Sequence, residues 1–323
     1  MAAGLVVTEK NLEEKQKLLI RETAGKYGFE TAFYSSAEEA DEAGAFGEAE
    51  ILYGGGLAPY LAKAPHLKWV CSSWAGVTPY CREGVMREDQ LLTNASGAYG
   101  VTIAEYGVMT ALMLMRGQIS YNTIMTTHGW LPPMPQATLK DARVTCLGTG
   151  DIGRTFAKRV RGFEPKSVVG ISRSGRPYED IFDAVYPQSE LKKVLADTDL
   201  LFMSLPATSE TRDILNKETL ACLPKGAYVV NVGRGNAIVE EDLIEALNEE
   251  RIAGAALDVM RHEPLPEDDP LWKAKNILIT PHVAGNMTTD YTRNTNVAMF
   301  CEDLVNYGEG RPLKHLVDRK AGY

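Results

Sequence analysis

Three charged residues in the last third of the chain are of the types that together reduce a carbonyl group. Each follows a short apolar run that is typical of a buried parallel strand. The residues are Arg234, Glu263 and His282, and the runs are 227–230, 255–259 and 277–280. Ligands of an open α/β sheet bind outside the carboxyl ends of its strands, so we expect these side chains to reach one crevice.

The chemistry expected of this set is the reduction of a 2-keto acid. Arg234 can bind the carboxylate and carbonyl of such a substrate through its forked donors. His282 can protonate the developing alkoxide, and Glu263 can keep the imidazole charged. Ordinary alternatives exist, because Arg234 could form a structural salt bridge and a lone histidine more often packs or caps. We favour catalysis because the three occur together.

A hydride source is predicted upstream by a glycine pattern between a strand and a helix. The strand candidate 142–147 runs into Gly148-Thr149-Gly150-Asp151-Ile152-Gly153, and helical spacing follows over 154–160. The first glycine permits a tight turn, the second lets the backbone approach a pyrophosphate, and the third allows close helix packing. The helix N-terminus attracts the anion. We therefore assign cofactor contacts to Gly148, Gly150, Asp151, Ile152 and Gly153, the alternative being an ordinary strand–helix turn.

The end of the next strand, 167–171, indicates which dinucleotide binds. An NAD site normally has an acidic residue there, about 20 residues after the glycines, whereas this chain has Ser172-Arg173-Ser174. Hydroxyls and a guanidinium bind a 2′-phosphate. We therefore favour NADP(H). In the alternative, the basic loop is solvated and backbone groups hold NAD(H).

Further cofactor contacts are expected near other strand ends. Leu205 and Pro206 should border the adenosine, and we expect Thr211 to cap a short helix that follows. Asp258 is a candidate partner of the nicotinamide carboxamide, and a structural aspartate bonded to backbone is an equal alternative. The remaining predicted cofactor contacts are His282 itself and three residues near the catalytic candidates, Val232, Gly233 and Gly285.

Together these motifs resemble the D-isomer-specific 2-hydroxyacid dehydrogenase family from about Trp69 to about Arg311. The resemblance implies an α/β fold of two Rossmann-like domains. A central NAD(P)-binding domain is expected at 99–286, and a discontinuous, flavodoxin-like substrate-binding domain at 1–98 and 287–323. It also implies a D-2-hydroxy acid as the reduced product, a cleft that closes on the substrate, and a homodimer formed through residues 101–142.

The segment Ser73-Trp74-Ala75-Gly76-Val77-Thr78 departs from that family at two positions. Thr78 stands where the family usually has Asp, and Trp74 is bulkier than the usual residue. The backbone amides of this segment are still available to a carboxylate. We therefore expect Trp74, Ala75 and Gly76 to bind the substrate together with Arg234 and His282. The Ser172-Arg173-Ser174 segment resembles the glyoxylate/hydroxypyruvate reductase branch, whose members commonly use NADPH.

The remaining elements are expected to complete two sheets. Strand candidates lie at 5–8, 50–53, 67–72 and 91–94, and an apolar helix is predicted at 101–116. Residues 130–135 contain three prolines, which indicates an extended arm, and 286–306 is a candidate return helix.

The composition of the chain limits the kinds of partner and the cellular compartment that we expect. The chain has 323 residues, 45% hydrophobic, with a net charge of −9, so we expect no nucleic-acid partner and no attraction to anionic membranes. No apolar run reaches the length of a membrane span, and the start lacks a signal peptide. The cysteine count is odd and the five histidines are scattered. These features favour a cytoplasmic protein with reduced thiols and no metal site.

Two other functions are compatible with this fold. A cofactor-sensing regulator, resembling the corepressors related to these dehydrogenases, can keep all three charged residues. The short termini, without a long arm for partner recruitment, weigh against it. An NAD-dependent phosphoglycerate-type dehydrogenase is the other alternative, and Ser172-Arg173-Ser174 argues against its usual cofactor.

Overall fold

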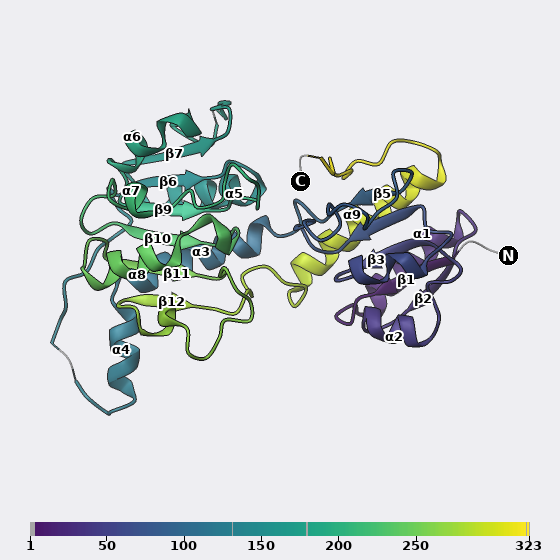
Figure 1. Ribbon diagram of the computed structural model, residues 1–323, viewed down its shortest axis with the longest axis horizontal. Coiled ribbons are helices and arrows are strands. Elements are labelled where there is room, and N and C mark those ends of the chain that lie inside the picture. The colour runs from purple at the N-terminus through teal and green to yellow at the C-terminus, as the bar shows by residue number, and fades with distance from the viewer. Residues whose placement is uncertain (1–3, 131, 179, 321, 323) are drawn as a thin grey trace. The chain divides into compact units, whose positions relative to one another are not determined.

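The computed structural model describes residues 4–130, 132–178, 180–320 and 322, and the chain divides into two compact units (Figure 1). Unit 1 is formed by Met1–Tyr99 and Asn286–Tyr323, and unit 2 by Gly100–Gly285. The domain limits expected from the sequence differ from these limits by one residue. Residues 1–3 of the expected substrate-binding domain and residue 131 of the expected arm lie outside the described residues.

Unit 1 contains a parallel five-stranded sheet of order β2-β1-β3-β4-β5, which is the flavodoxin-like order. All five carboxyl ends therefore lie at one edge. The strands are β1 (Gly4–Thr8), β2 (Glu30–Phe33), β3 (Ala49–Gly54), β4 (Trp69–Ser72) and β5 (Leu91–Thr93).

Helices cover both faces of this sheet because side chains of opposite parity along each strand are buried against them. Helices α1 (Glu14–Gly25) and α9 (Asp290–Gly308) pack on one face, where Tyr53 and Phe300 stack with ring centroids 4.2 Å apart. Helix α2 (Ala37–Glu42) and the 3-10 helix η1 (Ala58–Lys63) contribute to the core on the other face. Helix α9 thus brings the far end of the chain onto the N-terminal sheet.

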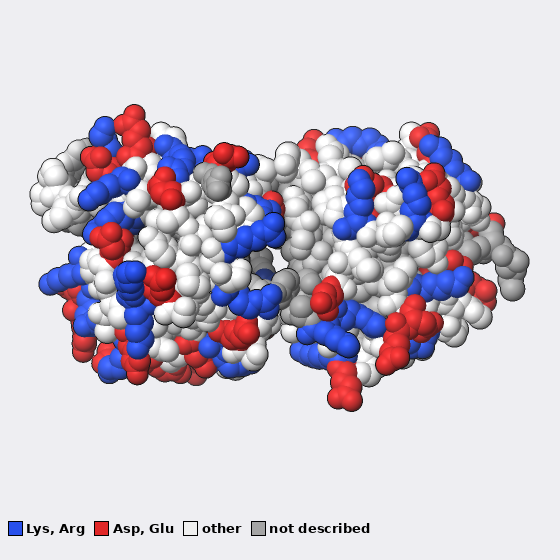
Figure 2. Space-filling view, turned by 90° about the horizontal axis from the view of Figure 1, so that it is seen from above, with Lys and Arg blue, Asp and Glu red and all other residues white. Residues whose placement is uncertain are grey.

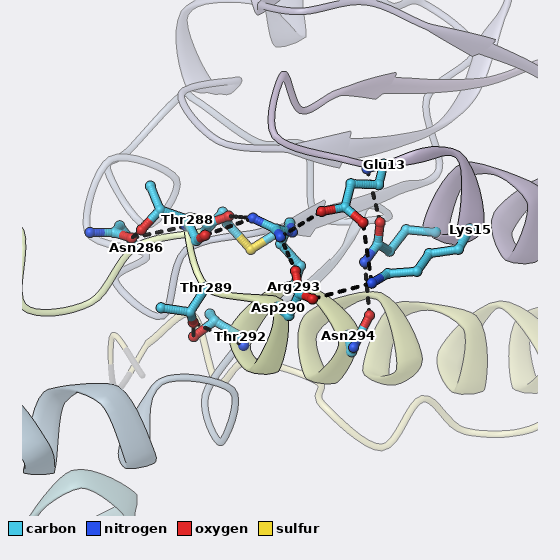
Figure 3. Close-up of polar contacts among 11 residues, drawn as sticks. Glu13, Lys15, Asn286, Thr288, Thr289, Asp290, Thr292, Arg293 and Asn294 are labelled. Atoms are coloured by element: carbon cyan, nitrogen blue, oxygen red, sulfur yellow. Dashed lines mark hydrogen bonds and ion pairs between the residues drawn. The ribbon is translucent and has the colours of Figure 1, made fainter.

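A buried cation fixes the start of α9 against the N-terminal region of the chain (Figure 3). Arg293 donates to the carbonyl of Thr288 at 2.7 Å and to the Glu13 carboxylate at 2.8 Å, and it also pairs with Asp290. Glu13 is the N-cap of α1. One guanidinium therefore joins the chain segment that enters α9 to the start of α1.

Unit 2 contains a parallel seven-stranded sheet of order β12-β11-β10-β9-β6-β7-β8. Counted from β6, this is the Rossmann order 3-2-1-4-5-6 with one further strand. The strands are β6 (Arg143–Leu147), β7 (Ser167–Ser172), β8 (Ala184–Pro187), β9 (Leu200–Met203), β10 (Tyr228–Asn231), β11 (Gly254–Leu257) and β12 (Ile277–Ile279). The order reverses between β6 and β9, the point where such sheets bind nucleotides.

Two layers of helices bury this second sheet. Helices α3 (Gly100–Met115) and α5 (Asp151–Val160) cover one face, where the rings of Phe156 and Phe202 stack 3.8 Å apart. A Cβ at Gly107 of α3 would lie 2.5 Å from the Phe202 ring, so only glycine allows this approach. The opposite face is covered by α6 (Leu191–Leu195), α7 (Lys217–Leu220) and α8 (Glu240–Asn248), with the short helices η2 (Arg161–Phe163), η3 (Gln188–Glu190), η4 (Gly235–Ala237) and η5 (Pro270–Lys273) between elements.

Helix α4 (Gln118–Met125) differs from the other α-helices of the described residues because it has no buried residue. Met125 on α4 is strongly exposed, and Trp130 beyond it is 99% exposed. Within the described part of the chain, no helix combines the length and the apolar character needed to cross a bilayer. The face shown in Figure 2 carries basic and acidic side chains interspersed.

Candidate active site

Arg234 is held at the end of β10 by a turn that Asn231 organises. The side-chain oxygen of Asn231 accepts from the Gly233 amide at 3.0 Å, and its amide group donates to the Arg234 carbonyl at 3.1 Å. The guanidinium in turn donates to the Gly233 carbonyl at 2.6 Å. Burial lowers the pKa of Arg234, and the Glu263 carboxylate acts in the opposite direction. A guanidinium stays protonated at any pH at which a protein folds, so the group is a partly buried cation.

The glycines beside Arg234 allow neighbouring turns to come into contact. A Cβ at Gly233 would lie 2.6 Å from the amide nitrogen of Leu205, beyond β9. A Cβ at Gly235 would lie 2.0 Å from the carbonyl carbon of Met260, beyond β11. Since real Cβ atoms do not approach so closely, the turn carrying Arg234 can pack between its neighbours only with glycine at both positions.

His282 and Glu263 form the contact expected from the sequence. The Nδ1 atom of His282 lies 2.7 Å from Oε2 of Glu263. The other oxygen of Glu263 accepts from the Met260 amide at 2.9 Å, so both oxygens of the carboxylate are bonded. The imidazole, bonded through Nδ1, keeps Nε2 as the nitrogen that can exchange a proton with a ligand.

A second layer of bonds positions the loop of Glu263. The Arg261 amide donates to Glu240 at 2.7 Å, and the Arg261 guanidinium donates to the Ile238 carbonyl and pairs with Asp213. Glu240 is buried, and this desolvation raises the pKa of its carboxyl. The loop is therefore tied to the first residue of α8 and to the segment just before this helix.

Asp258 holds the loop of His282 through hydrogen bonds to residues on both sides of the histidine. This side chain is 1% exposed, and it accepts from the Thr280 hydroxyl at 2.6 Å and from the amides of Val283 and Ala284 at 2.9 Å. His282 itself has φ of +55°, a left-handed conformation that costs energy for a residue with a Cβ. The bonds on both sides of His282 hold it in this conformation. Asp258 thus accepts from backbone amides, as expected of a structural aspartate. A contact between Asp258 and a cofactor stays a prediction.

The Thr280 hydroxyl extends this network to helix α3. Tyr106 lies 2.6 Å from Thr280 through its phenolic oxygen, and burial raises the pKa of Tyr106 to about 12. The phenol therefore stays neutral and acts as a hydrogen-bonding group in this chain of contacts.

His282 and Glu263 border a largely apolar pocket of about 500 Å³. Its lining residues come from the loop after β11, the helix η5, the end of β12 and the loop after it: Met260, Glu263, Pro264, Leu265, Trp272, Ile279, Pro281 and His282. A ligand that reaches the imidazole can therefore also contact an apolar surface in unit 2.

The glycine pattern forms the turn between β6 and α5. Gly148 has φ of +107°, and a Cβ at Gly153 would lie 2.0 Å from the Gly148 carbonyl oxygen. A Cβ at Gly150 would meet nothing within 4 Å, so the backbone there is open to a ligand. Asp151 starts the helix, but its Oδ2 is buried beside Gly100, without a hydrogen-bond partner among the described residues. Ile152 follows it in the first turn of the helix, whose amides suit a pyrophosphate.

The other predicted cofactor residues lie at neighbouring strand ends. Ser172 ends β7, and its hydroxyl accepts from the Gly175 amide at 3.0 Å, which shapes the turn containing Arg173 and Ser174. Leu205 is buried beyond β9. Thr211 does not cap a helix, and that expectation was wrong. Its hydroxyl donates to the Pro206 carbonyl at 2.6 Å and closes the loop, while α7 begins later and is capped by Asn216.

The predicted substrate loop lies in unit 1, where hydrogen bonds hold its backbone. The Ser73 carbonyl accepts from the hydroxyl of Tyr99 at 2.5 Å and from Asn296 at 2.8 Å, and Asn94 donates to the Ala75 carbonyl at 2.7 Å. Within the described residues, the amides of Ala75 and Gly76 have no protein acceptor. These two N–H groups can therefore bind a carboxylate.

The sequence does not predict three supporting hydrogen bonds: that between Arg261 and Glu240, that between Tyr106 and Thr280, and that from the Ser73 hydroxyl to Glu9. Each joins residues far apart in the sequence without a spacing that would mark it. Among the described residues, no group of three or more His, Cys, Asp or Glu side chains is arranged to hold a metal ion.

Known proteins share both the fold and these motifs. Residues 108–284 match the model of the D-isomer specific 2-hydroxyacid dehydrogenase NAD binding domain. A glyoxylate/hydroxypyruvate reductase A of Klebsiella pneumoniae (strain 342) is 36% identical over 226 residues, which are 69% of this chain and 70% of that protein.

Solved structures extend the likeness to nearly the whole chain. A D-isomer specific 2-hydroxyacid dehydrogenase family protein from Aeromonas salmonicida superposes with a TM-score of 0.85 at 33% identity, covering 99% of this chain and 100% of that one. An NADPH-dependent glyoxylate/hydroxypyruvate reductase from Sinorhizobium meliloti, in complex with NADP and sulfate, gives a TM-score of 0.83 at 27% identity, covering 99% and 100%.

The Rossmann-type sheet and the glycine turn define a nicotinamide-dinucleotide oxidoreductase. The chain belongs to the D-isomer specific 2-hydroxyacid dehydrogenase family, whose enzymes act on CH–OH groups. The family and the α/β fold with two Rossmann-like units predicted from the sequence are thereby confirmed.

Proposed function

We propose that this enzyme reduces a small 2-keto acid to the D-2-hydroxy acid with NADPH, and catalyses the reverse oxidation with NADP⁺. The observation that carries the proposal is the 2.7 Å contact between His282 and Glu263, which suits an acid–base pair. These two residues and Arg234 follow the neighbouring parallel strands β12, β11 and β10. Geometry of this kind is required before a histidine can act as general acid.

The side chains divide the work as follows. His282 donates a proton from Nε2 to the carbonyl oxygen, and Glu263 stabilises the charged imidazole before the transfer. Arg234 stabilises the negative charge that grows on the oxygen. The amides of Ala75 and Gly76 bind the substrate carboxylate beside Trp74. When bound, the dinucleotide supplies a hydride from C4 of its nicotinamide to the carbonyl carbon. In the reverse direction His282 accepts the proton.

The residues of unit 2 support the binding of NADP(H), the dinucleotide that carries a 2′-phosphate. The open backbone at Gly150 and the N-terminus of α5 suit a pyrophosphate. Ser172, Arg173 and Ser174 offer two hydroxyls and a guanidinium to a 2′-phosphate, and none is an acid that would repel it. The Sinorhizobium relative was solved with NADP. Leu205, Pro206, Thr211, Val232, Gly233, Asp258 and Gly285 complete the proposed cofactor surface.

Glyoxylate and hydroxypyruvate are the first substrates to test, because two relatives are named for their reduction. We further propose that the enzyme is a cytoplasmic homodimer assembled through residues 101–142. Helix α4, which buries no residue within its own chain, and the exposed Trp130 support this assembly. A covered apolar surface is the ordinary explanation for such exposure.

The test is an initial-rate assay of NADPH and NADH oxidation with glyoxylate and hydroxypyruvate, followed by chiral analysis of the product from a substrate larger than glyoxylate. We expect NADPH to be preferred and the D-enantiomer to form. Tight NADPH binding without turnover of any 2-keto acid would instead favour a cofactor-sensing regulator.

A further inference from the structure

Glu9 places a carboxylate at the edge of unit 1 where the predicted substrate loop lies. It follows β1 directly, at the carboxyl end of that strand. The ends of β3 and β4 are at the same edge, and they contribute Gly55 and Ser73 to its surroundings. Because ligands of parallel sheets bind at this edge, a charged group here is placed to contact one.

Among the described residues, hydrogen bonds reach one of the two oxygens of Glu9. Oε1 accepts from the Gly55 amide at 2.9 Å and from the Ser73 hydroxyl. Among the described residues, no group donates to Oε2, and no cation pairs with Glu9 within 4.0 Å. The carboxylate is thus fixed in orientation, with one oxygen left to bind a ligand.

The energetics of Glu9 favour a cationic partner. Burial raises the pKa of the Glu9 carboxyl, while the Ser73 hydroxyl, the Gly55 amide and the charge of Lys10 act in the opposite direction. Taking a carboxylate out of water is costly unless it is paired, so a ligand cation would offset a cost that the chain itself leaves in place.

Trp74 supplies an aromatic surface next to this carboxylate. A Cβ at Gly55 would lie 2.4 Å from the indole nitrogen of Trp74, so the indole packs directly over the backbone that donates to Glu9. The Trp74 side chain is nevertheless 50% exposed, which leaves ring surface for a ligand. A carboxylate beside an accessible aromatic ring is the combination that binds ammonium and guanidinium groups.

We propose that Glu9 and Trp74 form a subsite for a positively charged substituent of the substrate. The preferred 2-keto acids then carry an ammonium or guanidinium at the end of the side chain, and those with a second carboxylate are rejected. The inference rests on the proposed function, because the loop of Ala75 and Gly76 must hold the common 2-keto acid end. Anionic substrates are excluded by repulsion from Glu9, not by size.

The test compares three 2-keto acids whose side chains end in a positive, a neutral and a negative group, with the full-length enzyme and NADPH: 5-guanidino-2-oxopentanoate, 2-oxohexanoate and 2-oxoadipate. We expect kcat/KM to be highest for the guanidino substrate and lowest for 2-oxoadipate, with the extremes at least about tenfold apart. Glu9→Gln keeps an oxygen for Gly55 and Ser73 but removes the charge. The ratio of guanidino to neutral kcat/KM, taken within each variant, should fall by roughly tenfold.

The matched control is Glu30→Gln, the same change at an exposed residue at the amino end of β2 on the opposite edge of this sheet. Its ratio should equal that of the wild type. Trp74→Leu should lower the ratio as well, because the aromatic face is lost. Equal kcat/KM for the three acids in the wild type, or an unchanged ratio in Glu9→Gln, overturns the inference while glyoxylate reduction persists. Failure to reduce any 2-keto acid, glyoxylate included, overturns the proposed function and the inference with it.

Discussion

Asp258 accepts a 2.6 Å hydrogen bond from the Thr280 hydroxyl, and the two residues stand just beyond the neighbouring strands β11 and β12. The same carboxylate accepts from the two amides that follow His282. The general acid proposed here is therefore positioned by a group that does not touch its ring.

Thr280→Val removes the hydroxyl while keeping the shape of the side chain. We expect kcat to fall by roughly tenfold, since hydrogen bonds to a charged group are worth about 1.5–3 kcal/mol, with a smaller change in NADPH affinity. Steady-state rates and a fluorescence titration with NADPH separate the two effects. Thr295→Val is the control, because that hydroxyl only bonds to its own helix. Comparable losses in both variants would argue against a positioning role.

His282→Asn should lower kcat by roughly 10²–10⁴, the usual contribution of a general acid, while NADPH still binds. Glu263→Gln should lose less, because the imidazole is still present. His262→Asn provides a neighbouring control, since that exposed residue takes no part in the proposed chemistry. A fall in activity at position 262 as large as that at 282 would refute the assignment.

Arg234→Lys should reduce kcat/KM for glyoxylate by roughly 100-fold, because an ammonium cannot replace two parallel bonds from a planar guanidinium. Arg234→Ala should lose at least as much, and added guanidine should restore part of the activity. The measurement is the initial rate over a range of glyoxylate concentrations. Full activity of the lysine variant would show that only a positive charge is required.

Arg173→Ala should raise the KM for NADPH by roughly tenfold or more through the loss of a charge-assisted bond to the 2′-phosphate. The KM for NADH should change little. Arg251→Ala, at another exposed arginine of unit 2, should affect neither. An equal rise in the KM for NADPH and for NADH would show that Arg173 does not recognise the 2′-phosphate.

Asp199→Asn should destabilise unit 2 at neutral pH. Arg143 donates to Asp199 from its backbone amide, Nε and Nη2, joining β6 to the start of β9. Hydrogen bonds from the Arg143 side chain lower the pKa of Asp199. This stabilisation is present above the usual carboxyl pKa of about 4 and is lost as the pH falls through the lower folded value. Urea unfolding should show a difference of about 1 kcal/mol near pH 7 that shrinks toward pH 3. A difference that does not change with pH would contradict this account.

Strand ends could be predicted well from the sequence because buried parallel strands are continuous apolar runs. The positions of His282 and Glu263 just beyond two such runs predict the bond between them. The glycine turn was also predictable, since its spacing follows from the steric needs of one local structure. The roles of these residues in catalysis and cofactor binding stay predictions until the variants are measured.

Other features could not be read from local patterns. Strands β2 and β8 are edge strands whose residues are only partly buried, so they lack a clear apolar run. Helix α4 has no buried face to mark it. Glu9 looks like an ordinary turn residue beside Lys10, and only its contacts with Gly55 and Ser73 distinguish it. Such contacts depend on the register of whole strands, which a single sequence does not reveal.

The missing side chain at Gly235 has an evolutionary consequence. Because the turn of Arg234 presses against the carbonyl of Met260, any larger residue at 235 would displace the segment that leads to Glu263. A substitution at Gly235 would therefore disturb the positions of Arg234 and Glu263 together. Descendants of this enzyme would more easily acquire new preferences through the loops of unit 1, around Trp74 and Glu9, and inherit an unaltered reaction.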